Sequence, residues 1–515
     1  MPWGWLSPRG QVLSRAGIGV LSHVIGPGLV DEAVGDGLAW EMRLRSLPAR
    51  LGVYFVLGLC LFSGQPYVAV LRELTEGLQQ ALGAAGWAVP SSTALTMARR
   101  RIGEKPLEAL FRRLRPGLPP GSDPWSHAFG LLTVAWDGTT VAVADSPANA
   151  AAFGRPGAGR RRPAKNQAEP AKDRACVYPQ VRLAVLAACG SRALLDAALG
   201  PLRGKGTGER DLARQMLGSL RAGMLLLADK GFYSYDLWTA SAATGAHLLW
   251  RARDDMLLPA ARQLPDGSWL ARVPDPRAAY ARRHNNGRRR RRGSALGPDT
   301  APLPSVTVRV IEFRLAAAGD DGRRRTERYR LITTLLDHRA APAPALAACY
   351  ARRWAIETGF RELKTYLRGP GRVLRGRTPD LARQELWAYL AVYQAIRTLA
   401  ARAAARDGLD PARISFTATL HAARRAITPA RDSMSTALSA LETEILHPRA
   451  LVPERHGRVY PRHAKRATAQ YRPATRTAPK SQHAEYTITI TPHHQTAPTP
   501  HHQAKQPKPT PANPP

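Results

Sequence analysis

Residues 131–137 read Leu-Leu-Thr-Val-Ala-Trp-Asp, a short apolar run that ends in Asp137 and is followed by Gly138. Such a run, bounded by a turn dipeptide, predicts a buried β-strand. Residues 224–229, Met-Leu-Leu-Leu-Ala-Asp, repeat the pattern and end in Asp229. The sequence therefore predicts two inner strands of one sheet, each with an aspartate at its carboxyl end.

The elements around these two runs predict an α/β fold. Further strands are expected at 181–188, 192–199 and 246–250, and helices at 209–220 and 235–243. The order of strand, hairpin, helix, strand, helix and strand describes a mixed sheet flanked by helices rather than a barrel or a sandwich.

Composition and periodicity divide the chain into five expected segments. They are a helical N-terminal region (1–125), a first part of the core (126–253), a β-rich insertion (254–340), a second, helical part of the core (341–450) and a disordered basic tail rich in Pro and His (451–515). Within the insertion, strands are expected at 306–315 and 329–335, and a flexible loop around the arginine block 288–292.

The net charge indicates a polyanionic partner. Against 75 Lys and Arg stand 39 Asp and Glu, which leaves +36 and a pI near 11.2. Nucleic acid is the first candidate. A GC-rich genome also enriches arginine, so part of the charge can be incidental. An anionic membrane surface is the competing partner, but the chain has neither a basic amphipathic helix nor a lipid anchor motif.

The cysteines and the apolar segments indicate a cytoplasmic protein that reaches the nucleoid. Four cysteines, Cys60, Cys176, Cys189 and Cys349, lack the paired spacing of disulfide frameworks or zinc sites. The most apolar stretch, residues 51–62, is too short to cross a bilayer. We therefore expect no membrane association.

The N-terminal region contains a candidate DNA-binding element. A periodic run at 67–82 and a second helix capped by Ser91 or Ser92 could form a helix-turn-helix. The second helix ends in Arg99, Arg100 and Arg101, which we predict to contact DNA. The same pattern also fits a small helical bundle whose terminal arginines complement the helix dipole.

Asp137 and Asp229 are candidate metal ligands. Strand ends are where α/β sheets place ligand sites, and carboxylates are the hard oxygen ligands that Mg²⁺ and Mn²⁺ prefer. Phosphodiester cleavage uses two such ions, which activate the attacking oxygen and neutralise the leaving one. Each aspartate alone could equally be a turn or capping residue.

A helix expected at 344–367 supplies the third acidic group. Tyr350, Arg353, Glu357 and Lys364 fall on one stripe at about 100° per residue, whereas Glu362 points to nearly the opposite face. This selects Glu357 as the third ligand and places Arg353 and Lys364 where they could contact phosphates. An ordinary solvated helix face would show similar charges.

These four residues have the spacing Y-x2-R-x3-E-x6-K, which resembles the YREK signature of the insertion element 4 family of DDE transposases from bacterial insertion sequences. Asp137-Gly-Thr and Asp229-Lys-Gly-Phe-Tyr resemble the segments that hold the first two catalytic aspartates of that family. The resemblance extends over about residues 30 to 430.

The resemblance implies an RNase H-like (retroviral integrase-like) core with a β-rich insertion, preceded by a helical region that binds element ends. It implies that Asp137, Asp229 and Glu357 are catalytic and bind two Mg²⁺ ions, which Mn²⁺ can replace. Tyr350, Arg353 and Lys364 would then bind DNA or position phosphates. The implied activity is cut-and-paste transposition of double-stranded DNA at terminal inverted repeats, by a homodimer on DNA.

Two other functions remain open from the sequence. A simple metal-dependent nuclease could use the same core, and a DNA-binding regulator could keep the fold and charge without cutting. The intact acidic triad argues against the regulator. Trp250 and Trp354 could stack on a flipped base, but we expect both to pack in the core.

Overall fold

The computed structural model describes most of the chain. The described residues are 12, 17–37, 47–78, 82–83, 87–116, 124–156, 178–291, 301–318, 324–427, 434–453, 458–459, 482–483 and 486–492. Cys176 and the His-rich segment after residue 492 lie outside this set, as does Arg292 at the end of the arginine block.

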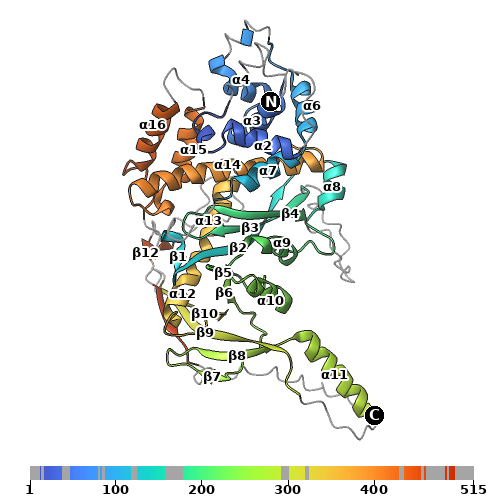
Figure 1. Ribbon diagram of the computed structural model, residues 1–515, viewed down its shortest axis with the longest axis vertical. Helices are drawn as coiled ribbons and strands as arrows, with labels where there is room; N and C mark the ends of the chain where they lie inside the picture. The colour runs from blue at the N-terminus through green and yellow to red at the C-terminus, as the bar shows by residue number, and fades with distance from the viewer. Residues whose placement is uncertain are drawn as a thin grey trace, which may run out of the picture.

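A central mixed sheet of eleven strands organises the molecule (Figure 1). Its strand order is β4-β3-β2-β5-β6-β10-β9-β8-β7, with β1 on β2 and β13 on β9. The strands are β1 (His127–Ala128), β2 (Leu131–Ala142), β3 (Gln180–Ala188), β4 (Leu194–Pro201), β5 (Met224–Ala228), β6 (His247–Arg251), β7 (Arg262–Gln263), β8 (Trp269–Pro274), β9 (Ser305–Ala318), β10 (Arg324–Thr333) and β13 (Tyr486–Ile490). The pairs β2–β5 and β5–β6 are parallel, and all others are antiparallel. This confirms the predicted mixed α/β architecture.

Alternate residues of the inner strands face two different cores. Val134, Trp136 and Leu226 pack with α9 (Glu209–Gln215) and α10 (Tyr235–Ala243), while Ala135 and Leu227 pack toward the helices on the other face. The helices on that second face are α12 (Ala343–Tyr350), η7 (Ala351–Trp354), α13 (Ala355–Arg361) and the π-helix η8 (Glu362–Leu367). Because side chains alternate along a strand, neighbouring odd-numbered residues on β2 and β5 share this second face.

The N-terminal helices form a bundle around the long helix α14 (Pro379–Arg406), which crosses the molecule between them and the sheet (Figure 1). The bundle contains η2 (Gly19–His23), α2 (Pro27–Gly37), α3 (Ala49–Leu61), α4 (Tyr67–Thr75), η3 (Glu76–Leu78), α6 (Ser92–Ile102) and α7 (Lys105–Arg113). The apolar run at 51–62 forms α3, whose residues from Leu51 to Leu61 are all buried, and α3 packs on α14. Ser91 caps α6 by accepting a hydrogen bond from the Ala94 amide, as predicted.

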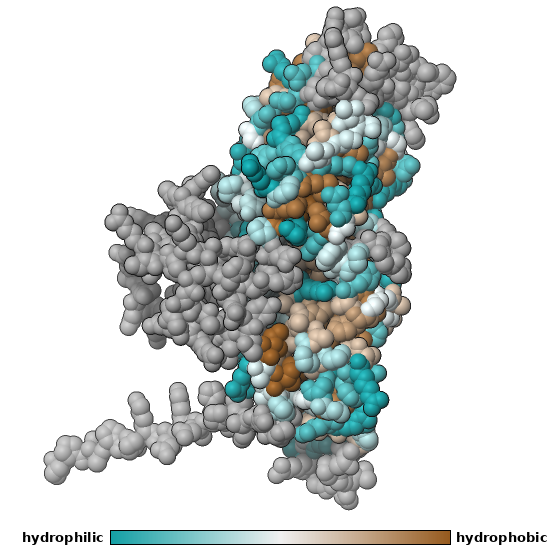
Figure 2. Space-filling model, turned by 90° about the vertical axis from the view of Figure 1, so that its left-hand side faces the viewer, coloured by the Kyte–Doolittle hydropathy of each residue, from teal (hydrophilic) through white to brown (hydrophobic). Residues whose placement is uncertain are grey.

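The remaining helices are short connectors or flank α14. They are η4 (Pro124–Ser126), α8 (Pro147–Phe153), η6 (Leu217–Ser219), η9 (Pro411–Arg413), α15 (Phe416–Arg425) and α16 (Met434–Leu446). None of the helices in the described ranges combines the length and apolar character needed to cross a lipid bilayer. On the face seen in Figure 2, hydrophilic residues surround smaller groups of hydrophobic ones.

The segment predicted as an insertion adds its strands to the central sheet. β10 pairs with β6 and with β9, so β7–β10 extend the sheet rather than form a separate one. The prediction of a flexible loop at the arginine block was wrong up to Arg291, because residues Pro276–Arg291 form a helix, α11. The side chain of Asp275 accepts a hydrogen bond from the Arg277 amide at the start of this helix.

The prediction of a disordered tail was wrong for residues 486–492. Here β13 pairs antiparallel with β9, from Tyr486 opposite Ala317 to Ile490 opposite Phe313. The Thr491 amide continues the pairing by donating to the Glu312 carbonyl at 2.9 Å. A second pair of short strands, β11 (Arg458–Val459) and β12 (Gln482–His483), also lies in the predicted tail. Edge strands form whenever an open row of backbone groups finds a partner, even where few apolar residues mark the segment.

Candidate active site

The two predicted aspartates lie side by side on neighbouring parallel strands. β2 pairs with β5 in parallel up to Ala135 opposite Leu227, so two further residues along each chain bring Asp137 level with Asp229. The prediction that the strand ends at Asp137 was wrong, since β2 continues to Ala142 and Asp137 pairs with Val185 of β3. What ends at this point is the parallel pairing with β5.

Both aspartates continue the odd-numbered series that faces α12 and α13. Ala135 and Leu227 precede them by two residues, and both pack in the core on that side of the sheet. Gly138 belongs to the opposite face, where a Cβ would lie only 2.7 Å from Cδ of Glu209 on α9. The alternation of β2 therefore turns Asp137 toward the helix that carries Glu357.

Arg353 links the third acidic residue to this site. Its Nη2 donates to Glu357 Oε1 at 3.2 Å. The guanidinium is buried, with a side-chain exposure of 10%, whereas the Glu357 side chain is 56% exposed. Burial alone would lower the pKa of Arg353, but interactions with Tyr350, Asp229, Asp137 and Glu357 raise it above its usual value. Arg353 is thus the positive charge that all three carboxylates share.

Asp137 is held in an environment that disfavours its ionised form. Burial is the largest cause and raises its pKa from 3.8 to about 6. The Gly138 amide, which donates to Oδ1 at 2.8 Å, and Arg353 oppose the shift, while the charges of Glu357 and Glu209 add to it. A cation at this carboxylate would offset the cost of its desolvation.

Tyr350 and Lys364 attach the helical segment to the sheet at two points. The Tyr350 hydroxyl is buried and donates to the Ala228 carbonyl at 3.4 Å, directly before Asp229. Lys364 Nζ donates to Thr139 Oγ1 at 3.0 Å, two residues after Asp137. Burial, with help from Arg368, lowers the pKa of Lys364. Thr139 is a site residue that the sequence analysis missed, although it lies on the same face as Asp137.

After α12, the helical segment changes its geometry three times. It passes from a 3-10 turn in η7 through α13 to the π-helix η8. Glu362 nevertheless points away from the site, as predicted: it is buried, and it binds Arg192 and accepts from the Tyr393 hydroxyl at 3.2 Å. Glu362 therefore stabilises the packing of the segment and is no alternative to Glu357.

The three carboxylates do not form a ready metal cage in this structure. Among the described residues, no three His, Cys, Asp or Glu side chains are grouped closely enough to hold a metal ion. The donors still fit a hard divalent cation in kind, because they are carboxylate oxygens. One of the three, Glu357, is exposed and restrained by a single ion pair on its own helix.

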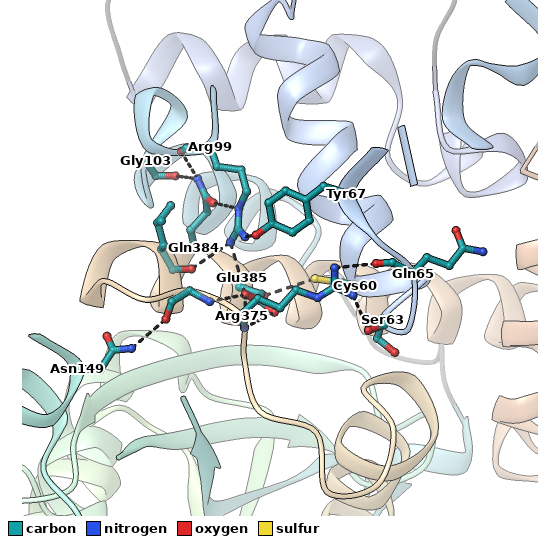
Figure 3. A network of polar contacts seen from close by, with 12 residues as sticks. Cys60, Ser63, Gln65, Tyr67, Arg99, Gly103, Asn149, Arg375, Gln384 and Glu385 are labelled. Carbon is teal, nitrogen blue, oxygen red and sulfur yellow. Dashed lines mark hydrogen bonds and ion pairs between the residues drawn. The ribbon is translucent and has the colours of Figure 1, made fainter. Parts of the chain in front are cut away.

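Three of the predicted DNA-contacting residues, Arg99, Tyr350 and Arg353, are buried. Arg99 is only 1% exposed and lies at the centre of the network in Figure 3, where it binds Gln384 Oε1 at 3.1 Å, Glu385 Oε2 at 3.5 Å and the Tyr67 hydroxyl. The predicted contact of Arg99 with DNA was therefore wrong, because the guanidinium joins α6 to α14. Tyr350 is likewise buried and out of reach of DNA in this structure.

The other N-terminal arginines differ from Arg99 in exposure. Arg101 donates to the Leu47 carbonyl at 2.7 Å and is half-buried, while Arg100 is exposed on α6. The predicted contact of Arg100 with DNA stays a prediction.

The two tryptophans considered for stacking also differ. Trp250 is fully buried against Trp136 and Trp238, which confirms its expected place in the core. Trp354 is 51% exposed beside Arg353, so the expectation that it packs in the core was wrong. Its position in a 3-10 turn rather than an α-helix changes the direction it faces.

Comparison with known proteins relates most of the chain to transposases, as the resemblance in the sequence predicted. A family model described as transposase DDE domain matches residues 129–394, and one described as insertion element 4 transposase N-terminal matches residues 15–112. The transposase InsG for insertion sequence element IS4 of Escherichia coli K12 is 27% identical over 379 residues, which is 73% of this chain and 75% of InsG. The putative transposase InsZ of the same strain is 30% identical over 212 residues, or 41% of this chain and 62% of InsZ.

A solved structure of the piggyBac transposase synaptic complex with hairpin DNA aligns over 87% of this chain and 86% of its own, with a TM-score of 0.38 and 9% identity. The first family model covers the N-terminal helices, and the second covers the sheet and the helix that carries Glu357, so it spans all three acidic residues. The chain therefore belongs to the DDE transposases of the insertion element 4 family.

Proposed function

We propose that Asp137, Asp229 and Glu357 form the catalytic triad of an RNase H-like core that cuts and joins DNA at the ends of an insertion sequence. The observation that carries this proposal is the shared interaction of the three carboxylates with Arg353, with the two aspartates level on adjacent strands. The triad would hold two Mg²⁺ ions, or Mn²⁺ in their place. Such ions supply an activated water and neutralise charge on the leaving oxygen.

The protein's own groups fix the positions of the reacting parts. β2 and β5 hold the two aspartates on a rigid sheet, and the Tyr350 hydroxyl fixes the helical segment to the end of β5. Arg353 binds the exposed Glu357 carboxylate and also interacts electrostatically with both aspartates. In this proposal the carboxylates come from three separate elements, and Arg353 is the cation that interacts with all of them.

Arg353 and Lys364 are the phosphate-positioning groups of this proposal. Arg353 lies among the carboxylates and can exchange part of its interaction with Glu357 for a DNA phosphate. Lys364 donates a hydrogen bond to Thr139, which lies two residues after Asp137 on β2. Arg100 on the N-terminal bundle would contact the terminal inverted repeat. A homodimer would hold the two ends of one element during cut-and-paste transposition.

The test is a strand-transfer assay with a duplex that ends in the free 3′-hydroxyl of a pre-cut element end. The protein with Mg²⁺ is expected to join this end to a target plasmid, which gives a product longer than the substrate. A simple nuclease would only shorten the DNA, and a non-catalytic binding protein would leave it unchanged. Either of these two results would contradict the proposal.

A further inference from the structure

Helix α11 projects from the sheet at the end of the molecule opposite the N-terminal bundle (Figure 1). Its sequence, Pro-Arg-Ala-Ala-Tyr-Ala-Arg-Arg-His-Asn-Asn-Gly-Arg-Arg-Arg-Arg, contains seven arginines and no acidic residue. None of its described side chains is buried. The helix therefore contributes nothing to the hydrophobic core, and its surface is strongly basic along most of its length.

Among the described residues, ion pairing with the rest of the chain neutralises only the first turn of α11. Arg277 forms an ion pair with Asp236 of α10 at 2.6 Å. Further along, Arg283 donates to the Ala279 carbonyl of its own helix. Within the described ranges, no carboxylate pairs with Arg283, Arg288 or Arg291. The positive charge accumulates toward the end of the helix that lies farthest from the sheet.

A helix of this composition is poorly stabilised by its own chain. Like charges three and four residues apart repel each other. The helix also has no apolar face whose burial could offset the entropy lost when its backbone is ordered. A bound polyanion would remove the repulsion. An anionic membrane is a poorer match, because a helix that lies in the lipid interface needs an apolar face, and α11 has a single exposed aromatic residue, Tyr280.

The position of α11 relative to the candidate site identifies the part of the DNA that it can reach. The triad elements β2, β5 and α13 lie between the N-terminal bundle and α11 (Figure 1). A duplex bound by the bundle and cut at the triad would continue toward α11 on the far side of the scissile phosphate. We propose that α11 binds the phosphate backbone of the duplex that flanks the element end, a proposal that rests on the function proposed above.

The experiment compares two duplexes that share one element end. One carries flanking duplex beyond the cleavage position, and the other stops at that position. The variant is Arg283→Ala/Arg288→Ala. The control is Arg402→Ala/Arg449→Ala, which removes the same charge from exposed residues of α14 and of the segment after α16. Binding is measured by fluorescence anisotropy over a range of salt concentrations, with Ca²⁺ in place of Mg²⁺ to prevent cleavage.

For the flanked duplex, the α11 variant is expected to bind roughly tenfold more weakly, and the slope of log K against log salt should fall by about two, one for each lost phosphate contact. Binding to the end-only duplex should match that of the control variant. A loss no greater than the control's on the flanked duplex would overturn the proposal, and so would an equal loss on both duplexes. If the unmodified protein binds neither duplex, the proposed function itself fails.

Discussion

Asp137 is a largely buried carboxylate at the proposed metal site. Its pKa is raised to about 6 because burial disfavours the charged form, and the nearby charges of Glu357 and Glu209 add to this effect. A residue that destabilises the protein without its metal and DNA is expected at a catalytic site, where function and stability compete.

Replacement of this carboxylate should therefore stabilise the protein in the absence of divalent ions. The folded-state pKa lies above the unfolded value of 3.8, so the destabilisation is fully present above pH 6 and disappears as the pH falls below about 4. We expect Asp137→Asn to raise the free energy of unfolding by roughly 1–3 kcal/mol at pH 7.5. Urea denaturation in EDTA at pH 7.5 and pH 4.5 measures the difference. A variant that is less stable at pH 7.5 would contradict the assigned cause.

Replacement of Arg99 should affect stability, whereas replacement of its neighbour Arg100 should affect DNA binding. Arg99 is buried and binds Gln384 and Glu385, so Arg99→Ala leaves a carboxylate without its buried partner and should lower the free energy of unfolding by roughly 3 kcal/mol. Arg100 is exposed, so Arg100→Ala should leave stability unchanged and weaken only DNA binding. Urea denaturation and anisotropy on the same preparations check both. Equal stability of the two variants would contradict the structural role of Arg99.

The contrast between these arginines shows what the sequence leaves open at the residue level. Helix periodicity places Glu357 and Glu362 on opposite faces, and the structure confirms this separation. Burial of Arg99 depends on α14, whose contacting residues lie more than 280 positions later in the chain. No local pattern predicts a partner at that distance.

At the scale of elements, the sequence predicts strands and helices well where one face is continuously apolar. The bounds predicted for α10 agree with the structure, and the hairpin of β3 and β4 was expected close to its observed place. The end of β2 was missed, because Asp137-Gly138 has the composition of a turn while the chain in fact continues to Ala142 along β3. The local sequence does not predict the pairing of β6 with β10 either, because this pairing joins segments about 80 residues apart.

The amino-acid composition of residues 451–515 predicted disorder, yet this segment contains the strand β13. β8 covers the first half of one edge of β9, and β13 covers residues 313–317 on the second half. β13 also packs beside α12, the helix that leads to Tyr350 and Arg353. The strand therefore protects an otherwise open edge next to the catalytic helix.

Removal of β13 should expose this edge. We expect deletion of residues 481–515 to increase hydrogen exchange at the backbone amides of residues 313–317, because their partner strand is lost. Deletion of residues 493–515 keeps β13 and serves as the control. Mass spectrometry of exchanged peptides makes the comparison. Unchanged protection in the longer deletion would mean that β13 does not hold the edge.

At the scale of the whole molecule, the sheet and α14 place three surfaces in a row: the N-terminal bundle, the acidic site and the basic helix α11 (Figure 1). The network of Arg99, Gln384 and Glu385 ties the bundle to α14. Glu385 also accepts from the Arg375 and Gly376 amides, in the loop that leaves the catalytic helix (Figure 3). If the bundle holds DNA as proposed, a rigid connection of this kind would let the DNA enter the acidic site in a fixed position.

The three carboxylates are proposed to act as one site, and cleavage by variants that each lose one charge tests this proposal. Asp137→Asn, Asp229→Asn and Glu357→Gln are compared with Glu209→Gln, which removes a carboxylate that interacts with Asp137 from the opposite face of the sheet. Cleavage of a labelled element-end duplex in Mg²⁺ is measured beside its binding. We predict that each triad variant loses cleavage but still binds the duplex, while Glu209→Gln cuts at close to the normal rate. Cleavage by Glu357→Gln at the rate of the unmodified protein would contradict the account.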